Sequence, residues 1–211
     1  MEAEFWHKRW QNNQIAFHED APNTLLTAHF AALGLPAGAV VFVPLCGKTT
    51  DMPWLRSRNY RVVGAELSRL AVEQFFGERG LVPTVTPAGR LERFESEGIT
   101  LFLGDLFELD KATLGPIDAL YDRAALVALP EPMRERYAAH LLALTGASPQ
   151  LLVTFDYDQS LANPPPHSVI EAEVRRHYEA HYRVELAERR DVPGGLKGVC
   201  PAQESAWLLR R

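Results

Sequence analysis

The stretch Ala39-Val40-Val41-Phe42-Val43-Pro44 decides the fold of this 211-residue chain. Its apolar residues follow one another without the polar alternation of a half-exposed strand, which is typical of a β-strand buried on both faces. The turn Leu45-Cys46-Gly47-Lys48 comes next, and residues 49–58 have a helical pattern. A buried strand that leads through a glycine turn into a helix predicts an α/β sheet.

The same alternation continues along the chain. Further buried strands are predicted at 61–65, 99–103, 117–121 and 151–155, with a short extended piece near 91–95. Other helices are predicted at 3–12, 22–33, 68–79 (with Ser68 as N-cap), 131–144 and 168–179. Strands that alternate with helices predict a mostly parallel, doubly wound sheet with helices on both faces.

The C-terminal part departs from this alternation. Two strands, 182–186 and 204–209, are joined by a glycine-rich loop, which predicts an antiparallel hairpin at one edge of the sheet. No linker is visible, so we expect one domain over 1–211, with 1–35 as a helical cover and 36–211 as the core sheet.

Composition limits the kind of partner. Hydrophobic residues make up 46% of the chain, and the net charge of −5 argues against a nucleic acid or an anionic membrane surface as partner. The two cysteines are far apart, and we see neither a signal peptide nor an apolar run of about 20 residues. We therefore expect a soluble, cytoplasmic protein. Separate expectations are a monomer, a small molecule as partner and no metal.

Residues that directly follow the strands are the candidate ligand contacts, because ligands bind beyond the carboxyl ends of such a sheet. Gly47 would let the backbone approach a ligand closely, and Glu66 ends the second strand about twenty residues later, the spacing of a carboxylate that binds a ribose diol. The alternatives are a tight turn without a ligand and a carboxylate that only complements a helix dipole. We expect Glu66 to lie outside the core.

Two other nucleotide-binding motifs are not matched. A phosphate-binding loop would need glycine at the position that Phe42 occupies. The Gly-x-Gly-x-x-Gly sequence of nicotinamide-dependent oxidoreductases does not follow the first strand. The ribose carboxylate by itself fits either a nicotinamide cofactor or S-adenosylmethionine, since both contain adenosine.

The third and fourth strands end in further candidates. Asp105 is suited to accept the adenine amino group, with Leu106 packed on the ring, although a capped turn explains Asp105 equally well. Arg123 follows the fourth strand, where a buried guanidinium needs an anionic partner. That partner is either a ligand or a neighbouring acid such as Asp122.

Several segments resemble the thiopurine S-methyltransferase family, especially its bacterial branch. The resemblance extends in order through nearly the whole chain and is looser after Pro164. It rests on Phe5-Trp6, Arg9-Trp10, Ala16-Phe17-His18, Val43-Pro44-Leu45-Cys46-Gly47-Lys48, Val63-Gly64-Ala65-Glu66-Leu67-Ser68, Gly104-Asp105-Leu106-Phe107 and Tyr121-Asp122-Arg123-Ala124-Ala125-Leu126-Val127-Ala128-Leu129.

This resemblance implies a class I methyltransferase fold with seven strands, S-adenosylmethionine as cofactor, and a thiopurine or other small thiol as acceptor, with selenium and tellurium compounds as further acceptors. It places Trp10, Leu45, Glu66 and Arg123 in the cofactor site. Trp10, Phe17 and His18 would belong to an N-terminal cover over the site.

Methyl transfer from a sulfonium mainly requires alignment and exclusion of water. We expect Arg123 to favour an anionic acceptor. No general base stands out: His18 and His167 are candidates only through their exposure to the predicted cleft. The competing hypotheses are a nicotinamide-dependent oxidoreductase and a cofactor-binding sensor without catalysis.

Overall fold

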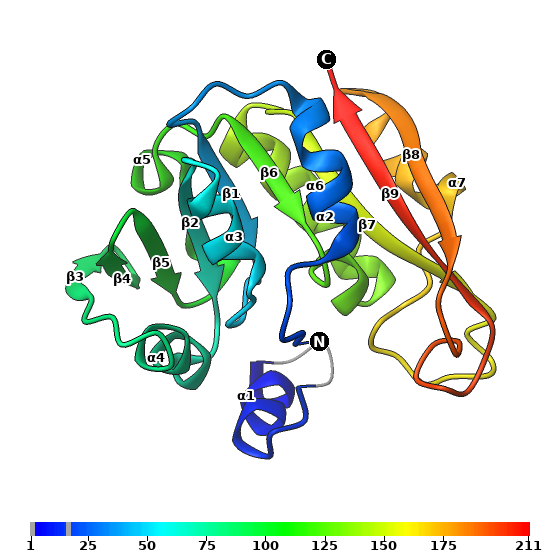
Figure 1. Ribbon diagram of the computed structural model, residues 1–211, viewed down its shortest axis with the longest axis horizontal. Helices are drawn as coiled ribbons and strands as arrows, with labels where there is room; N and C mark the ends of the chain where they lie inside the picture. Colours follow the sequence, from blue (N-terminus) through cyan, green and yellow to red (C-terminus); the bar gives the residue numbers. More distant parts are fainter. Residues whose placement is uncertain (1–2, 16–17) are drawn as a thin grey trace. The chain divides into compact units, whose positions relative to one another are not determined.

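The computed structural model describes residues 3–15 and 18–211. The chain forms two compact units. Figure 1 labels their helices and strands. The first contains the described residues up to Thr24 together with Leu35–Ala119, and the second contains Leu25–Gly34 and Leu120–Arg211.

The first unit has five strands in the order β3-β4-β5-β2-β1. Strands β1, β2 and β5 run parallel, whereas β3, β4 and β5 form an antiparallel meander. The strands are β1 (Val40–Pro44), β2 (Arg61–Glu66), β3 (Thr84–Ala88), β4 (Leu91–Ser96) and β5 (Ile99–Leu103). The helices are α1 (Ala3–Gln11), α3 (Asp51–Ser57), α4 (Arg69–Gly77), the short α5 (Lys111–Leu114) and the 3-10 turn η2 (Leu106–Glu108).

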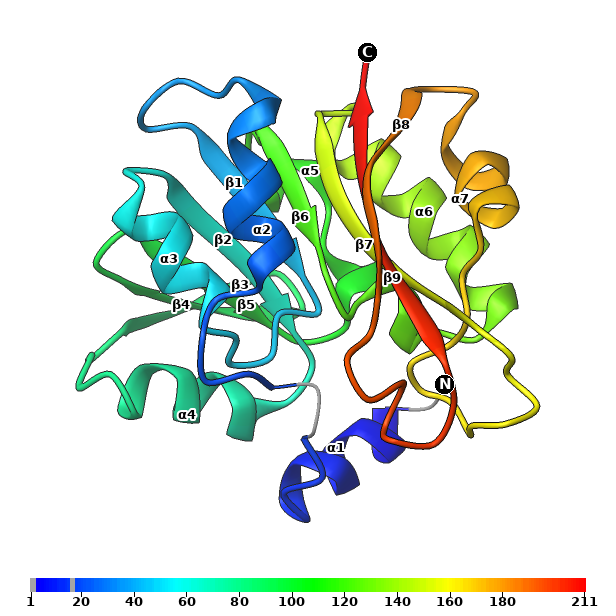
Figure 2. The same ribbon diagram turned by 45° about the vertical axis from the view of Figure 1, so that its right-hand side comes forward.

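The second unit has the strand order β6-β7-β9-β8 (Figure 2). Strands β6 and β7 are parallel, and β9 pairs antiparallel with both β7 and β8. The strands are β6 (Ala119–Asp122), β7 (Gln150–Tyr157), β8 (Arg183–Asp191) and β9 (Ala202–Arg210). The helices are α2 (Thr24–His29), α6 (Glu131–Thr145) and α7 (Glu171–Tyr178), with 3-10 turns η1 (Phe30–Leu33) and η3 (Leu126–Ala128).

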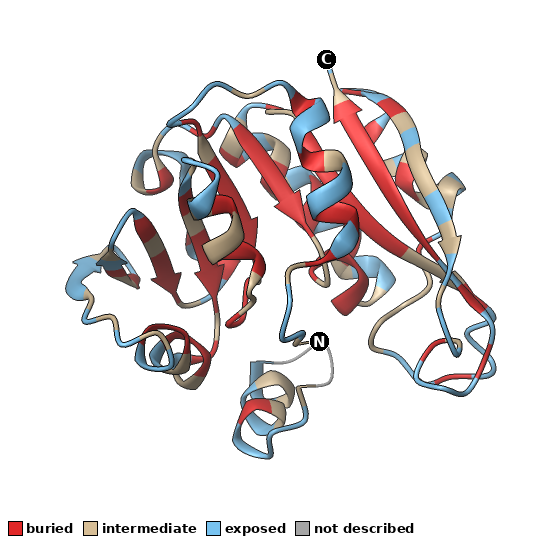
Figure 3. Ribbon diagram, in the orientation of Figure 1, coloured by how far each residue is buried: buried red, intermediate tan, exposed pale blue. Residues whose placement is uncertain are grey.

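Local sequence explains these elements. The apolar run of β1 is buried, as are most residues of β2, β7 and β9 (Figure 3). Ser68 caps α4 by accepting a hydrogen bond from the Ala71 amide, at 3.4 Å. Helix α6 ends at Thr145 and is followed by Gly146, whose φ of 63° lies in the left-handed region that glycine adopts easily.

The predicted fold class is confirmed: strands alternate with helices, the strands that follow crossovers are parallel, and β8 and β9 form the antiparallel C-terminal hairpin. The described part of the chain contains nine strands, so the expected number of seven is wrong. The additional strands are β3, which has mostly exposed residues and a proline, and β4, expected only as an extended piece. An apolar pattern cannot reveal a strand such as β3 that lies at the surface.

The expected N-terminal cover is divided between the two units, since α1 belongs to the first and η1 to the second. The predicted helix over 22–33 consists of α2 followed by η1. In the described residues, no helix is long and apolar enough to cross a membrane.

Candidate functional site

The turn after β1 has an unusual backbone conformation. Leu45 and Gly47 have φ angles of 47° and 53°, in the left-handed region, and the Cys46 amide donates to the Ala65 carbonyl oxygen at 3.0 Å. A left-handed conformation costs a non-glycine residue about 1–3 kcal/mol, and such residues are concentrated at functional sites. Leu45 is therefore held in place by the surrounding structure.

Glu66, at the end of β2, holds this turn. Its carboxylate accepts hydrogen bonds from the Gly47 amide at 2.8 Å and from the Ser68 amide at 2.7 Å. Only 6% of the residue is exposed, so the expectation that it lies outside the core is wrong. Burial raises the pKa of Glu66, and the amide donors act against that shift.

The carboxylate of Glu66 retains binding capacity. An ionised carboxylate can accept about four hydrogen bonds. The Gly47 and Ser68 amides use one on each oxygen, and the Leu67 amide also acts on this carboxylate. Capacity for a hydroxyl donor of a diol therefore remains. The Gly47 amide faces Glu66, so the contribution of Gly47 observed here is to fix this carboxylate.

A hollow of about 660 Å³ lies in the first unit, next to Leu67 and Ser68, the residues that follow Glu66. It is bounded by the ends of β2 and β5, the start of α4, and α1. Its lining includes His7, Gln11, Leu67, Ser68, Leu103 and Gly104. Trp10 is buried within α1, and His7 Nε2 lies 3.4 Å from the Leu67 carbonyl oxygen. The hollow is thus at the carboxyl ends of two neighbouring parallel strands, where ligands of doubly wound sheets bind.

The residues after β5 form a capped turn, which was one of the two interpretations of Asp105 given by the sequence. Asp105 is exposed, and its Oδ1 accepts a hydrogen bond from the Phe107 amide at 3.0 Å. Leu106 is buried. Contact of either residue with adenine stays a prediction.

Charged and polar residues follow the Leu45–Gly47 turn, beginning with Lys48. Lys48 is nearly buried, and its Nζ lies 2.5 Å from Glu78 Oε1. His18 is half-buried, and its pKa is lowered by burial and by the charge of Lys48. Phe17, the other predicted member of the cover, lies outside the described residues.

The second unit contains Arg123, which is half-buried directly after β6. The adjacent Asp122 is buried, and its carboxylate accepts hydrogen bonds from the Leu126 amide at 3.1 Å and the Tyr137 hydroxyl at 2.7 Å. Burial raises the pKa of Asp122 to about 6. Sequence reasoning did not identify Tyr137, because a tyrosine on a predicted helix gives no sign of its partner.

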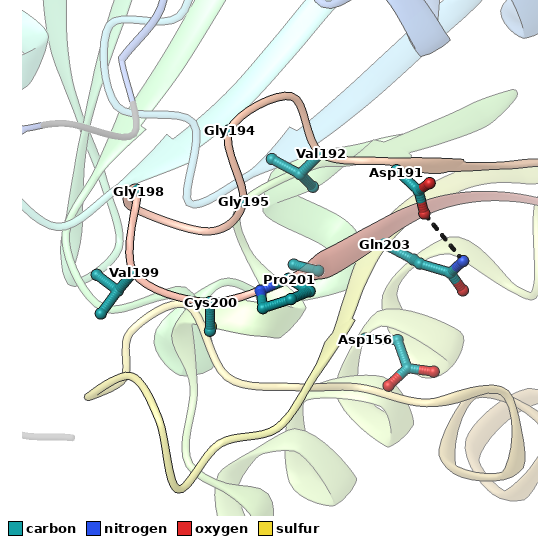
Figure 4. Close-up of a pocket in the computed structure, with 11 residues that line it drawn as sticks. Asp156, Asp191, Val192, Gly194, Gly195, Gly198, Val199, Cys200, Pro201 and Gln203 are labelled. Atoms are coloured by element: carbon teal, nitrogen blue, oxygen red, sulfur yellow. Dashed lines mark hydrogen bonds between the residues drawn. The ribbon is translucent and has the colours of Figure 1, made fainter.

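Another hollow of about 660 Å³ lies in the second unit, under the β8–β9 loop (Figure 4). Asp156, Asp191 and Gln203 supply its polar side chains, and Gln203 Nε2 donates to Asp191 Oδ1 at 3.2 Å. No predicted site residue lines this hollow.

Solved structures with the same fold are methyltransferases. The magnesium protoporphyrin IX methyltransferase of Synechocystis, with bound S-adenosylhomocysteine, matches with a TM-score of 0.68 at 13% identity and covers all of both chains. A Burkholderia thailandensis 1,6-didemethyltoxoflavin-N1-methyltransferase matches with a TM-score of 0.65 at 17% identity, over 99% of this chain and 87% of that one. The fold is therefore that of the class I methyltransferases.

Sequence comparison identifies the family within this class. The family model for thiopurine S-methyltransferase matches residues 1–211. The thiopurine S-methyltransferase of Xanthobacter autotrophicus is 56% identical over the full length of both chains, and that of Gluconobacter oxydans is 51% identical over 97% of this chain and 93% of its own. The chain belongs to the thiopurine S-methyltransferase family, and it is an S-adenosylmethionine-dependent methyltransferase.

Proposed function

We propose that this enzyme transfers the methyl group of S-adenosylmethionine to the sulfur of thiopurine-like or other small thiol acceptors. The observation that carries this proposal is the match of the whole chain to one family, with relatives of that name at up to 56% identity. The resemblance extends the acceptors to small selenium and tellurium compounds.

The geometry around Glu66 supports its role in holding the cofactor. A buried carboxylate at a strand end, fixed by backbone amides and with acceptor capacity remaining, fits a ribose hydroxyl. Leu45 would lie near the methionyl part, Leu106 and Asp105 near the adenine, and Trp10 in the cover. The cofactor brings an activated methyl group, so the chain needs only to bind, align and exclude water.

Arg123 is proposed to bind the acceptor as its sulfur becomes negative. A guanidinium remains protonated at any working pH, so it stabilises a thiolate-like acceptor without acting as a base. We also propose a monomeric cytoplasmic enzyme that binds neither nucleic acid nor membrane.

Two measurements test this function. Calorimetry should show binding of S-adenosylhomocysteine and none of NAD; binding of NAD alone would support the oxidoreductase alternative. A panel of thiol, selenol and thiopurine acceptors with labelled S-adenosylmethionine should then give labelled product. Cofactor binding without transfer to any acceptor would favour the non-catalytic sensor.

A further inference from the structure

His167 has an unsatisfied polar atom in the second unit. Its Nε2 is buried and has no hydrogen-bond partner among the residues that the structure describes. A buried polar atom without a partner costs about 1–3 kcal/mol, so it calls for an explanation such as a ligand contact.

Four hydrogen bonds fix the chain on either side of this residue. The Tyr157 hydroxyl donates to the Pro166 carbonyl oxygen at 2.6 Å, and the Tyr157 amide donates to Ser168 Oγ at 3.1 Å. The Ser168 amide donates to Gln159 Oε1 at 2.9 Å, and the Val169 amide donates to the Phe155 carbonyl oxygen at 2.7 Å. His167 is thus on a loop whose backbone is anchored to the end of β7.

The loop also returns to the end of β6. The His167 amide donates to the Val127 carbonyl oxygen at 2.6 Å, in the turn that begins with Arg123. The same turn is held by Arg134 Nη1, which donates to the Leu129 carbonyl oxygen at 2.8 Å. His167 and Arg123 therefore belong to one fixed assembly at the carboxyl ends of two parallel strands, β6 and β7, where ligands of this fold bind.

The environment of this imidazole favours its neutral form. Burial lowers the pKa of His167, the nearby positive charge of Arg134 on α6 lowers it further, and Glu173 on α7 acts in the opposite direction. A neutral imidazole with an available ring nitrogen can accept a proton at physiological pH. The sequence offered His167 only as one of two histidines near the cleft.

We propose that His167 is a catalytic residue that accepts the proton of a neutral acceptor through Nε2. The inference rests on the proposed function. In a thiopurine the proton is on the ring nitrogen beside the thiocarbonyl carbon, and in a simple thiol it is on sulfur. The acceptor sulfur forms a bond to the methyl carbon while the donor C–S bond breaks, and its electron pair stays on the departing sulfur. The acceptor proton moves to Nε2, and the resulting imidazolium later releases it to solvent.

The test compares two acceptors in the same enzyme preparation. Mercaptopurine is used below its own pKa, where it is neutral, and thionitrobenzoate is ionised throughout. His167→Phe keeps a ring without a proton acceptor, and we expect it to lower kcat/KM for mercaptopurine by about 10²-fold, as expected for loss of general base catalysis. Activity with thionitrobenzoate should change little. The ratio of kcat/KM for mercaptopurine to kcat/KM for thionitrobenzoate does not depend on the folded fraction of the preparation.

Two further variants sharpen this test. His167→Gln can accept a hydrogen bond but not a proton, so it should resemble His167→Phe; recovery of wild-type activity would overturn the proposal. His181→Gln changes an exposed histidine of the same unit and should keep the wild-type ratio. Equal losses with both acceptors in His167→Phe would show that His167 only supports the fold.

The pH profile gives an independent readout. Below the pKa of mercaptopurine, the wild-type kcat/KM should stay level until His167 itself is protonated, whereas His167→Phe should follow the ionised fraction of the acceptor. Identical profiles would overturn the proposal. If the wild type methylates thionitrobenzoate but not mercaptopurine, the proposal that thiopurines are acceptors fails. His167 is then tested in the same way with mercaptoethanol as the neutral acceptor.

Discussion

Glu66 and Gly47 are joined by a 2.8 Å hydrogen bond from the glycine amide to the carboxylate Oε2. This bond connects the end of β2 to the turn after β1, whose Leu45 has a left-handed backbone conformation. A group proposed to bind the cofactor ribose therefore also fixes the segment proposed to lie beside the methionyl part. Binding and local stability are coupled at this residue.

Replacement of Glu66 should separate these two contributions. Glu66→Ala removes the proposed ribose acceptor and leaves two buried amides unpaired, whereas Glu66→Gln keeps one side-chain oxygen. We expect both variants to weaken S-adenosylhomocysteine binding by about 1.5–3 kcal/mol, and Glu66→Ala to lose a further 1–3 kcal/mol of unfolding free energy. Calorimetry and urea unfolding measure the two effects. Normal cofactor affinity in a folded Glu66→Ala would refute the ribose role.

Gly64 tests the packing beneath this turn. A Cβ on Gly64 would lie 2.7 Å from Cys46 Sγ and 2.6 Å from Leu101 Cδ2, which is too close for either contact. We expect Gly64→Ala to reduce stability by about 1–3 kcal/mol and to weaken cofactor binding, because the turn must shift. Adding Cys46→Ala should restore part of both losses. Gly77→Ala is the control, since no atom lies within 4 Å of its Cβ position.

Glu173 should control stability in acid. It pairs with Arg134 at 2.5 Å and with His177 at 3.2 Å, and its side chain is only 11% exposed. Burial favours the neutral carboxyl, but the hydrogen bonds from His177 and Arg134 outweigh it and lower the pKa to about 2. Because the folded-state pKa is below the ordinary 4.5, this contribution is present above that pH and is lost as pH falls toward 2.

Urea unfolding over a pH series measures this contribution of Glu173 to stability. Glu173→Gln should lose about 3–5 kcal/mol at neutral pH, since it leaves a buried Arg134 without its counter-charge, and should show a smaller loss of stability in acid. Glu171→Gln, in a more exposed pair with Arg175, is the control and should change stability by less than about 1 kcal/mol. If the unfolding free energy of Glu173→Gln fell with decreasing pH as steeply as that of the wild type, Glu173 would not be the group that controls stability in acid.

Arg123 should matter more for the acceptor than for the cofactor. We expect Arg123→Ala to lower kcat/KM on the order of 10²-fold, as for loss of one group that stabilises developing charge, and Arg123→Lys to recover part of it. The defect should shrink above the pKa of the acceptor, where the acceptor is already ionised. A pH series of kcat/KM with one thiol acceptor measures this. Turnover equal to that of the wild type across the series would make Arg123 a structural residue.

Helix α1 should become protected when ligands bind. Its His7 and Gln11 line the hollow of the first unit, and His7 makes a long, exposed contact with the Leu67 carbonyl oxygen. A cover of this kind excludes water from the reaction. Hydrogen exchange of α1 should slow with S-adenosylhomocysteine and an acceptor, while exchange of β2 changes little. Equally slow exchange of α1 in both states would refute a mobile cover.

The sequence by itself determined the order of the main strands and helices and the position of Glu66 at a strand end. Continuous apolar runs such as Val40–Pro44 can be satisfied only by burial on both faces, so their pattern is visible without coordinates. Strand β3 could not be predicted in this way, because its residues are mostly exposed and are held by backbone pairing with β4.

Only the tertiary structure decided what the polar groups contact. Glu66 belongs to the core because amides 19 and 2 positions away converge on its carboxylate. His167, whose Nε2 is unsatisfied, is on a loop that returns to Val127, 40 residues earlier in the sequence. Burial and hydrogen bonding of a polar side chain are set by residues distant in sequence, so residue type and spacing alone do not reveal them.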